Sequence, residues 1–312
     1  MMKVLIIILV VILAILFLYF FASFKCFEVV FKTSKNFDDK RKHKDKKSKI
    51  AVAEEYLSNH EIVDLKTISD DKHELSAHLL KKGDTNLYLI MCHGWRGNWK
   101  ENTPIAEEID KKINCNFLFI EQRAHSTSMI KYSTMGWHER IDVLKWIDLI
   151  IKQDPRAQIV LYGDSMGATT LMNVSGEKLP SNVRCIIADC GFNSIKQQVL
   201  YSFKFINKFF IFFYFGISLL AKIILHISLK NDGPNKSLSN CGVPILFIHG
   251  TEDKFVPYSN LKANISCLNP SMDYDELAIE KAGHIASFYT EKEKYIDKCI
   301  TFIEKNLKNA EK

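Results

Sequence analysis

Ser165 lies at the centre of the pentapeptide GDSMG (163–167), which fits the pattern G-x-S-x-G. The apolar run 158–162 before it predicts a strand, and the residues after it predict a helix. A sharp turn between a strand and a helix exposes a serine hydroxyl at the edge of a sheet, and close backbone approach in such a turn requires glycine. We therefore predict that Ser165 is a nucleophile in a nucleophile elbow, with Gly163 and Gly167 as its glycines.

The base and the acid that such a serine needs follow it in the chain. A serine hydroxyl becomes a nucleophile when a histidine removes its proton and a carboxylate orients that histidine. For this type of elbow the expected order is serine, acid, histidine, with the later two in loops after later strands. Asp253 follows the predicted strand 243–248, and His284 follows the predicted strand Tyr274–Ile279. We predict Asp253 as the acid, with Glu252 as its rival, and His284 as the base.

Nucleophilic attack at an acyl carbon creates an oxyanion, which needs two preorganised N–H donors. We expect one donor to be the backbone N–H of Met166, the residue after the nucleophile. The second should come from the turn after the predicted strand Leu87–Cys92, where the N–H of Trp95 is the expected donor. We expect His93 to order this turn rather than to transfer protons.

Composition limits the classes of protein that this chain can be. Its 312 residues are 47% hydrophobic and 25% charged, which predicts a folded chain of one large or two small domains. Of 42 Lys/Arg and 36 Asp/Glu, residues 1–49 hold 11 and 4, so the remainder holds 31 and 32 and is nearly neutral. We therefore expect no nucleic-acid partner. The eight cysteines form no C-x-x-C pair, and we expect buried thiols, no disulfide scaffold, no metal site and no cofactor.

The amino terminus carries an uncharged run of 21 residues, 4–24. At 1.5 Å per residue a helix of this length crosses a hydrocarbon core of about 30 Å. We predict an uncleaved transmembrane anchor at 1–25 and a basic tether at 26–49; the alternative is a processed signal sequence. Ten Lys/Arg follow the run and one precedes it, so the positive-inside rule predicts a single-pass protein of the cell membrane with its domain in the cytoplasm.

The residues from 50 to 312 predict one domain in which strands and helices alternate. Ile62–Ile68 and Glu74–Leu80 predict a hairpin, and the later apolar runs predict strands that end in polar or glycine-containing loops. This alternation predicts an α/β protein with a mostly parallel sheet flanked by helices. The further predicted strands are 116–120, 158–162 and 184–188, and the predicted helices are 137–151, 166–175 and 292–308.

Several stretches of the chain resemble serine α/β-hydrolases, in particular a bacterial membrane-anchored branch near the esterase and prolyl-oligopeptidase-like groups. The resemblance implies the α/β-hydrolase fold over about 60–310 and implies Ser165, Asp253 and His284 as catalytic residues. One departure is Ala124, where many relatives have glycine; Arg123 and His125 beside it are expected to be structural. The matching stretches are 93–102, 121–128, 135–148, 162–172, 188–195, 244–257 and 281–284.

An insertion at about 195–235 is rich in aromatic residues, with nine Phe/Tyr between 201 and 215. Its longest uncharged run, 209–221, has 13 residues and is too short to span a membrane. A span there would also separate Ser165 from the predicted acid and base. We therefore predict a helical cap, or lid, whose aromatic side chains either line an acyl pocket and contact the bilayer or pack the cap onto the domain.

Together these features predict a membrane-anchored serine hydrolase of the carboxylesterase type. It would cleave small-molecule or lipid-like esters with apolar acyl groups through an acyl-enzyme. A lysophospholipase, an acyl thioesterase and a peptidase use the same triad and stay open, because fold and triad do not determine the substrate. A non-catalytic binding protein tethered to the membrane is the alternative from a different class.

Overall fold

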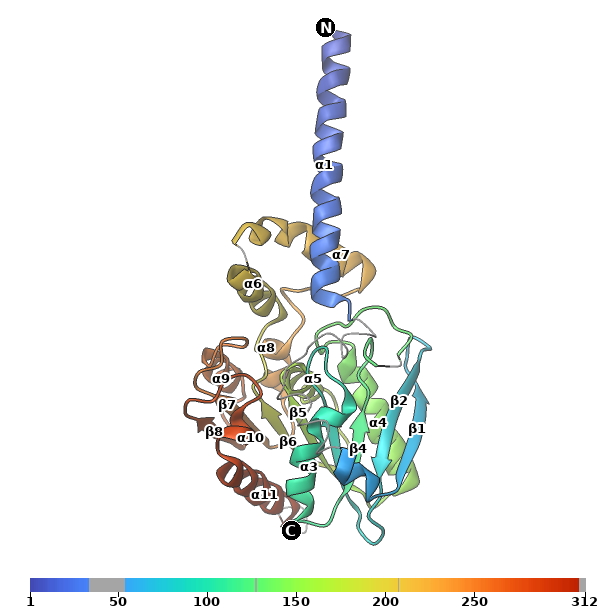
Figure 1. The fold of residues 1–312 in the computed structure, drawn as a ribbon, viewed down its shortest axis with the longest axis vertical. Helices are drawn as coiled ribbons and strands as arrows, with labels where there is room; N and C mark the ends of the chain where they lie inside the picture. The colour runs from blue at the N-terminus through green and yellow to red at the C-terminus, as the bar shows by residue number, and fades with distance from the viewer. Residues whose placement is uncertain (34–53, 127, 207, 309–312) are drawn as a thin grey trace.

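The structure, a computed structural model, describes residues 1–33, 54–126, 128–206 and 208–308. Most of the predicted tether therefore lies outside the described residues. Within them, one eight-stranded sheet has the strand order β1-β2-β4-β3-β5-β6-β7-β8 (Figure 1). The strands are β1 (Ile62–Ile68), β2 (Glu74–Leu80), β3 (Leu87–Cys92), β4 (Asn116–Ile120), β5 (Gln158–Asp164), β6 (Val183–Asp189), β7 (Ile245–Gly250) and β8 (Tyr274–Ile279).

The sheet is mostly parallel, which confirms the predicted fold class. β1 and β2 form an antiparallel hairpin and β2 pairs antiparallel with β4, whereas all pairs from β4 to β8 are parallel. The carboxyl ends of β3 and β5 to β8 therefore meet at one edge of the sheet. This edge is where side chains from distant parts of the chain can meet.

Both faces of the central strands are buried, and successive residues of such a strand contribute to opposite cores. In β3, Tyr88 and Ile90 enter one core, and Leu89 and Met91 enter the other. A strand that is buried on both faces has a continuous apolar sequence, which explains the uninterrupted runs. The first core is covered by α4 (Glu139–Gln153), α5 (Met166–Val174) and α9 (Ser259–Ile265), and the second by α3 (Thr103–Asp110), α10 (Ser287–Thr290) and α11 (Lys292–Lys308).

The three predicted helices are present: α11 has the predicted ends, and α4 and α5 differ from the predicted ranges by one or two residues at an end. The sequence prediction missed the shorter helices α3, α9 and α10. Helix α3 has eight residues, so its apolar side chains Ile105, Ala106 and Ile109 cover too few turns to establish a clear period. All eight cysteines lie within the described residues and are free thiols, and all except the partly exposed Cys267 are buried.

Helix α1 (Met2–Phe31) projects away from the domain, and among the described residues it is the only helix long and apolar enough to cross a membrane (Figure 1). Its amino-terminal part is exposed. Helix α1 continues six residues into the segment predicted as a tether, because Phe27 and Phe31 are fully buried on one face of the helix. These side chains belong to a third core, which contains residues of the predicted cap.

The segment between β6 and β7 forms short helices beside the base of α1, and α7 lies across it (Figure 1). Gly216 of α7 lies where the two helices cross. A Cβ atom at Gly216 would lie 2.2 Å from Oγ and 2.5 Å from Cβ of Ser23. Glycine therefore permits the close crossing. The helices of this segment are α6 (Ile195–Ile206), η3 (Lys208–Phe213), α7 (Tyr214–Ile224), α8 (Pro234–Ser237) and η4 (Leu238–Asn240).

We expect Gly216→Ala to lower the free energy of unfolding by about 1–3 kcal/mol, because the added methyl group forces α7 and α1 apart. Gly242→Ala is the matched control, since a Cβ atom there meets nothing within 4 Å. Its effect should stay within about 0.5 kcal/mol. Denaturant unfolding of the full chain in detergent micelles measures both. Equal effects of the two substitutions would contradict the close crossing.

Candidate active site

Ser165 lies in a strained turn between β5 and α5. Its φ is 52° and its ψ is −115°, a backbone conformation that residues with a side chain rarely adopt. A Cβ atom at Gly163 would lie 2.6 Å from the carbonyl carbon of Gly167, and one at Gly167 would lie 2.0 Å from the carbonyl oxygen of Cys92. The two glycines thus let three backbone segments meet around Ser165. This is the geometry of a nucleophile elbow.

Ser165, His284 and Asp253 form a continuous chain of hydrogen bonds. The distance between Ser165 Oγ and His284 Nε2 is 2.9 Å, and that between His284 Nδ1 and Asp253 Oδ2 is 2.7 Å. In the tautomer that satisfies both contacts, Nδ1–H donates to the carboxylate and Nε2 accepts from the hydroxyl. The three residues come from loops after β5, β7 and β8. The parallel sheet therefore brings together all three residues that the sequence selected.

Asp253 is held as a carboxylate although its side chain is fully buried. Its Oδ1 accepts hydrogen bonds from the backbone N–H groups of Phe255 and Val256, both at 2.8 Å. Burial by itself raises the pKa of Asp253, but hydrogen bonds from His249 and His284 lower it further, so the net pKa lies well below its ordinary value. A permanent negative charge at this position orients His284 and stabilises its protonated form.

The rival acid Glu252 does not contact His284. Its side chain is exposed, and its backbone N–H donates to the carbonyl of Ala282 at 2.9 Å. The two neighbouring carboxylates thus have different environments: that of Glu252 is exposed, whereas that of Asp253 is buried and accepts hydrogen bonds from the backbone of its own loop. The geometry selects Asp253 as the partner of His284.

The turn after β3 packs directly against the serine. A Cβ atom at Gly94 would lie 3.4 Å from Cβ of Ser165. His93 is buried, and both its ring nitrogens are occupied: Nδ1 donates to the carbonyl of Gly94 at 2.8 Å, and Nε2 accepts from the N–H of Gln122 at 3.2 Å. His93 therefore orders the turn that carries Trp95.

Trp95 and Met166, the predicted oxyanion donors, both line the pocket that contains Ser165. Met166 is the first residue of α5, so its N–H is among the amino-terminal groups that have no partner within the helix. The dipole of α5 also favours negative charge at this end. Both residues thus border the pocket that Ser165 also lines.

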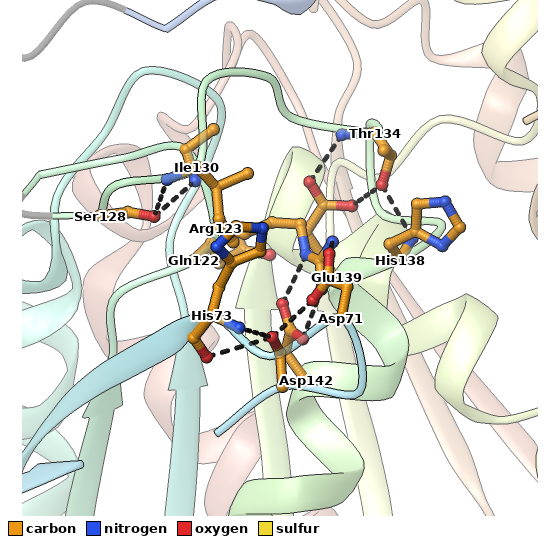
Figure 2. Close-up of polar contacts among 12 residues, drawn as sticks. Asp71, His73, Gln122, Arg123, Ser128, Ile130, Thr134, His138, Glu139 and Asp142 are labelled. Atoms are coloured by element: carbon orange, nitrogen blue, oxygen red, sulfur yellow. Dashed lines mark hydrogen bonds and ion pairs between the residues drawn. The ribbon is translucent and has the colours of Figure 1, made fainter. Parts of the chain in front are cut away.

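A buried network of polar side chains holds the loop after β4. Arg123 forms two hydrogen bonds with the carboxylate of Asp142, at 2.6 and 2.7 Å, and two with that of Asp71, at 3.0 and 3.4 Å (Figure 2). Close to it, Glu139 accepts a hydrogen bond from the N–H of Thr134 at 2.8 Å. Asp142 on α4 thus binds Arg123 in the loop after β4, and Arg123 in turn binds Asp71 in the loop after β1. Glu139, also on α4, binds the segment just before this helix.

Ala124 and His125 in this loop contact no reacting group. Ala124 has a φ of 66°, a conformation that glycine adopts at lower cost, which fits the glycine that the family resemblance implies at this position. His125 Nε2 accepts from the N–H of Arg96 at 2.9 Å, and burial lowers the pKa of His125 to about 3. A histidine that stays neutral in this way supports a loop and cannot carry protons at neutral pH.

Ser165 opens into a small apolar pocket of about 120 Å³. Sequence reasoning missed part of its wall, because Val29 and Val30 belong to α1. The spacing of Phe24, Phe27 and Phe31 was the available signal, since it continues a helical face beyond the predicted span. The lining residues are Val29, Val30, Trp95, Met135, Ser165, Met166, Phe192, Ile195, Gln198, Val199, Ser202, Phe203 and Phe255.

One group of potential metal ligands overlaps the site. The ligand atoms of Cys190, Asp253 and His284 lie within 4.8 Å of one another. Both ring nitrogens of His284 already have partners, and burial raises the pKa of Cys190 well above its ordinary value, which disfavours the thiolate that binds metals. The residues fit a proton relay better than a metal site.

Comparisons with known proteins agree with this fold. Residues 88–216 match the family model described as alpha/beta hydrolase fold. An uncharacterized protein of Bacillus subtilis, YqkD, is 24% identical over 190 residues, which cover 60% of this chain and 62% of that protein. The present chain therefore matches less than two thirds of the length of this relative.

Solved structures show the same fold at low sequence identity. An esterase of Pyrococcus furiosus, Pf2001, is similar with a TM-score of 0.63 and 21% identity, over 81% of this chain and 93% of that chain. An acylaminoacyl peptidase of Pyrococcus horikoshii has a TM-score of 0.59 and 16% identity, over 82% of this chain and 43% of that chain. Fold and site define an α/β protein with a nucleophile elbow. The chain has the α/β-hydrolase fold, and the part of it from 88 to 216 matches the model of that family.

The residue before the serine, Asp164, is fully buried beneath the site. Burial raises the pKa of Asp164 to about 8, and the charges of Glu101 and Asp189 contribute in the same direction. Its ordinary value is 3.8. Between these two values the folded chain keeps the proton and the unfolded chain releases it, so this group lowers stability as the pH rises through this range.

We expect Asp164→Asn to remove this pH dependence, because the amide is neutral in both states. The free energy of unfolding of the variant, relative to wild type, should increase from pH 5 to pH 8 by up to about 1.4 kcal/mol per pH unit. Denaturant unfolding at both pH values measures the difference. Asp148→Asn, on the exposed face of α4, is the control and should show little pH-dependent difference. A constant offset for Asp164→Asn would mean that Asp164 is ionised in the folded chain.

Proposed function

We propose that this protein is a membrane-anchored serine hydrolase that cleaves carboxylic esters with apolar acyl groups. The observation that carries the proposal is the continuous hydrogen bonding of Ser165, His284 and Asp253 at the floor of an apolar pocket. A serine hydroxyl that contacts a histidine, which a buried carboxylate orients in turn, is prepared for nucleophilic attack.

The proposed reaction has two halves. Ser165 Oγ attacks the ester carbonyl while His284 Nε2 takes its proton, and the N–H groups of Trp95 and Met166 stabilise the resulting oxyanion. When the tetrahedral intermediate collapses, His284 protonates the leaving alcohol and an acyl-enzyme remains on Ser165. Water then attacks this acyl group with His284 again as base, which releases the acid and restores the serine. Asp253 orients the imidazole throughout.

The pocket supports the choice of substrate class. Among the described residues that line it, none carries a charged side chain, and Val, Ile, Phe, Met and Trp predominate. Such a lining suits an apolar acyl group and offers no charged side chain to bind an anionic or cationic group. The esterase from Pyrococcus furiosus has the same fold, which is compatible with ester hydrolysis. Thioesters and lysophospholipids with similar acyl groups would fit the same pocket.

Membrane anchoring is supported by how α1 is built. Its exposed amino-terminal part has the length and composition of a span, and its carboxyl-terminal part belongs to a core of the domain. Removal of α1 as a signal sequence would expose this core, so we propose that the helix is retained. Phe212 and Phe215, 65% and 68% exposed beside α1, would contact the same bilayer. The positive charges after the span favour a cytoplasmic domain.

Labelling with an alkyl fluorophosphonate tests whether Ser165 is an activated nucleophile. We expect the folded full chain to be labelled at Ser165, and Ser165→Ala and His284→Ala to lose labelling. Both variants should retain only the residual ~10³–10⁴-fold rate over water that binding and the oxyanion hole supply in such enzymes. Peptide mass spectrometry locates the label, and p-nitrophenyl ester hydrolysis measures the rate. Wild-type protein that is folded and unlabelled would favour the non-catalytic binding protein.

The two adjacent acids give a matched pair of variants. We expect Asp253→Asn to lower kcat by about 10⁴-fold, because the amide holds His284 in the wrong tautomer. Glu252→Gln should keep kcat near that of wild type, since its side chain faces solvent. Steady-state kinetics on one p-nitrophenyl ester compares them. The reverse ranking would refute the role of Asp253.

A further inference from the structure

The end of α1 that adjoins the domain lies beside the proposed nucleophile. Val29 and Val30 line the same pocket as Ser165, although the serine follows them by more than 130 residues. Val30 is 8% exposed and lies within the wall, whereas Val29 is 52% exposed and lies where the helix meets solvent. One helix thus provides both the apolar span and part of the pocket.

Several contacts fix this part of α1 in place. Phe27 and Phe31 are fully buried, and the ring of Phe27 lies 5.1 Å from that of Tyr132. The backbone N–H of Ser133 donates to the carbonyl of Phe31 at 2.8 Å, and Lys32 pairs with Tyr132 in an antiparallel bridge. The backbone between these contacts has little freedom, so the positions of the two valines are defined.

The turn that carries Trp95 also holds α1. Arg96 donates from Nη2 to the carbonyl of Val29 at 2.9 Å and to that of Lys32 at 3.4 Å. The carbonyl of Val29 belongs to the last turn of α1 and that of Lys32 to its C-cap, where the helix itself supplies no donors. The wall that α1 contributes is therefore tied to the turn that faces Ser165.

We propose that Val29 and Val30 of α1 are specificity-determining residues that set the length of acyl chain accepted at Ser165. This inference rests on the proposed function. The pocket of about 120 Å³ is small compared with the roughly 300–1,000 Å³ of common ligand pockets, so a change of one wall residue alters a large part of it. A longer acyl chain passes Val30 and leaves the pocket along Val29.

Substitution at Val29 tests the inference in the full chain in detergent micelles. Val29→Phe narrows the exit without burying a new side chain, because this position is half exposed. The ratio of kcat/KM for p-nitrophenyl octanoate to that for p-nitrophenyl acetate should fall at least about tenfold. Val11→Phe, an exposed position of the same helix outside the pocket lining, should leave the ratio unchanged. If Val29→Phe lowers both rates equally, α1 has only a structural role and the inference is wrong.

A crosslinking experiment on the wild-type sequence avoids any effect of substitution on folding. An octyl fluorophosphonate with a terminal diazirine reacts at Ser165 Oγ with loss of fluoride, and light then converts the diazirine into a carbene that inserts into nearby bonds. Trypsin releases residues 26–32 of α1 and 197–204 of α6 as separate peptides. We expect crosslinks between the Ser165 peptide and 26–32. Crosslinks confined to 197–204 would overturn the inference alone, and absence of the label at Ser165 would overturn the proposed function and the inference with it.

Discussion

The hydrogen bond between His284 Nδ1 and Asp253 Oδ2, 2.7 Å long, determines what the rest of the site can do. It holds the imidazole so that Nε2 faces the hydroxyl of Ser165, and it requires a carboxylate that stays ionised inside the fold. Two backbone N–H groups and the neighbouring His249 offset the cost of burying that charge. The backbone of the loop after β7 therefore binds the carboxylate of Asp253, and this carboxylate binds the imidazole from the loop after β8.

The serine contributes to this arrangement through backbone geometry. Its positive φ costs conformational energy, which the packing of β3, β5 and α5 must offset. At Gly167 even a methyl group would overlap the carbonyl oxygen of Cys92, so the elbow is closed by direct contact between backbones. The polar network of Arg123, Glu139 and Asp142 supports the neighbouring loops from beneath. The strained backbone at Ser165 is thus kept in place by the packed elements and loops around it.

Helix α1 connects the proposed membrane span with the proposed substrate pocket. The exposed apolar turns end near Ala22, and the buried face begins at Ser23, within one continuous helix. Because Gly216 lets α7 cross α1 closely, the segment between β6 and β7 packs on α1 as well as on the sheet. In the proposed function, an acyl chain bound at Ser165 would therefore contact the helix that is proposed to anchor the chain in the membrane. One helix would thus contribute both to the proposed substrate preference and to the proposed attachment to the membrane.

The sequence by itself determined the features that depend on local spacing. The elbow around Ser165, the apolar strands buried on both faces, the amphipathic helix α11 and the order of serine, acid and histidine could all be predicted, because a strand, a helix or a turn constrains residues close to one another in the chain. Only the tertiary structure decided that Asp253 rather than Glu252 reaches His284, and that Val29 and Val30 line the same pocket as Ser165. These outcomes depend on contacts between segments that are separated by many residues. The hydrophobic periodicity of a sequence describes local structure and does not predict which distant side chains meet at the edge of a sheet.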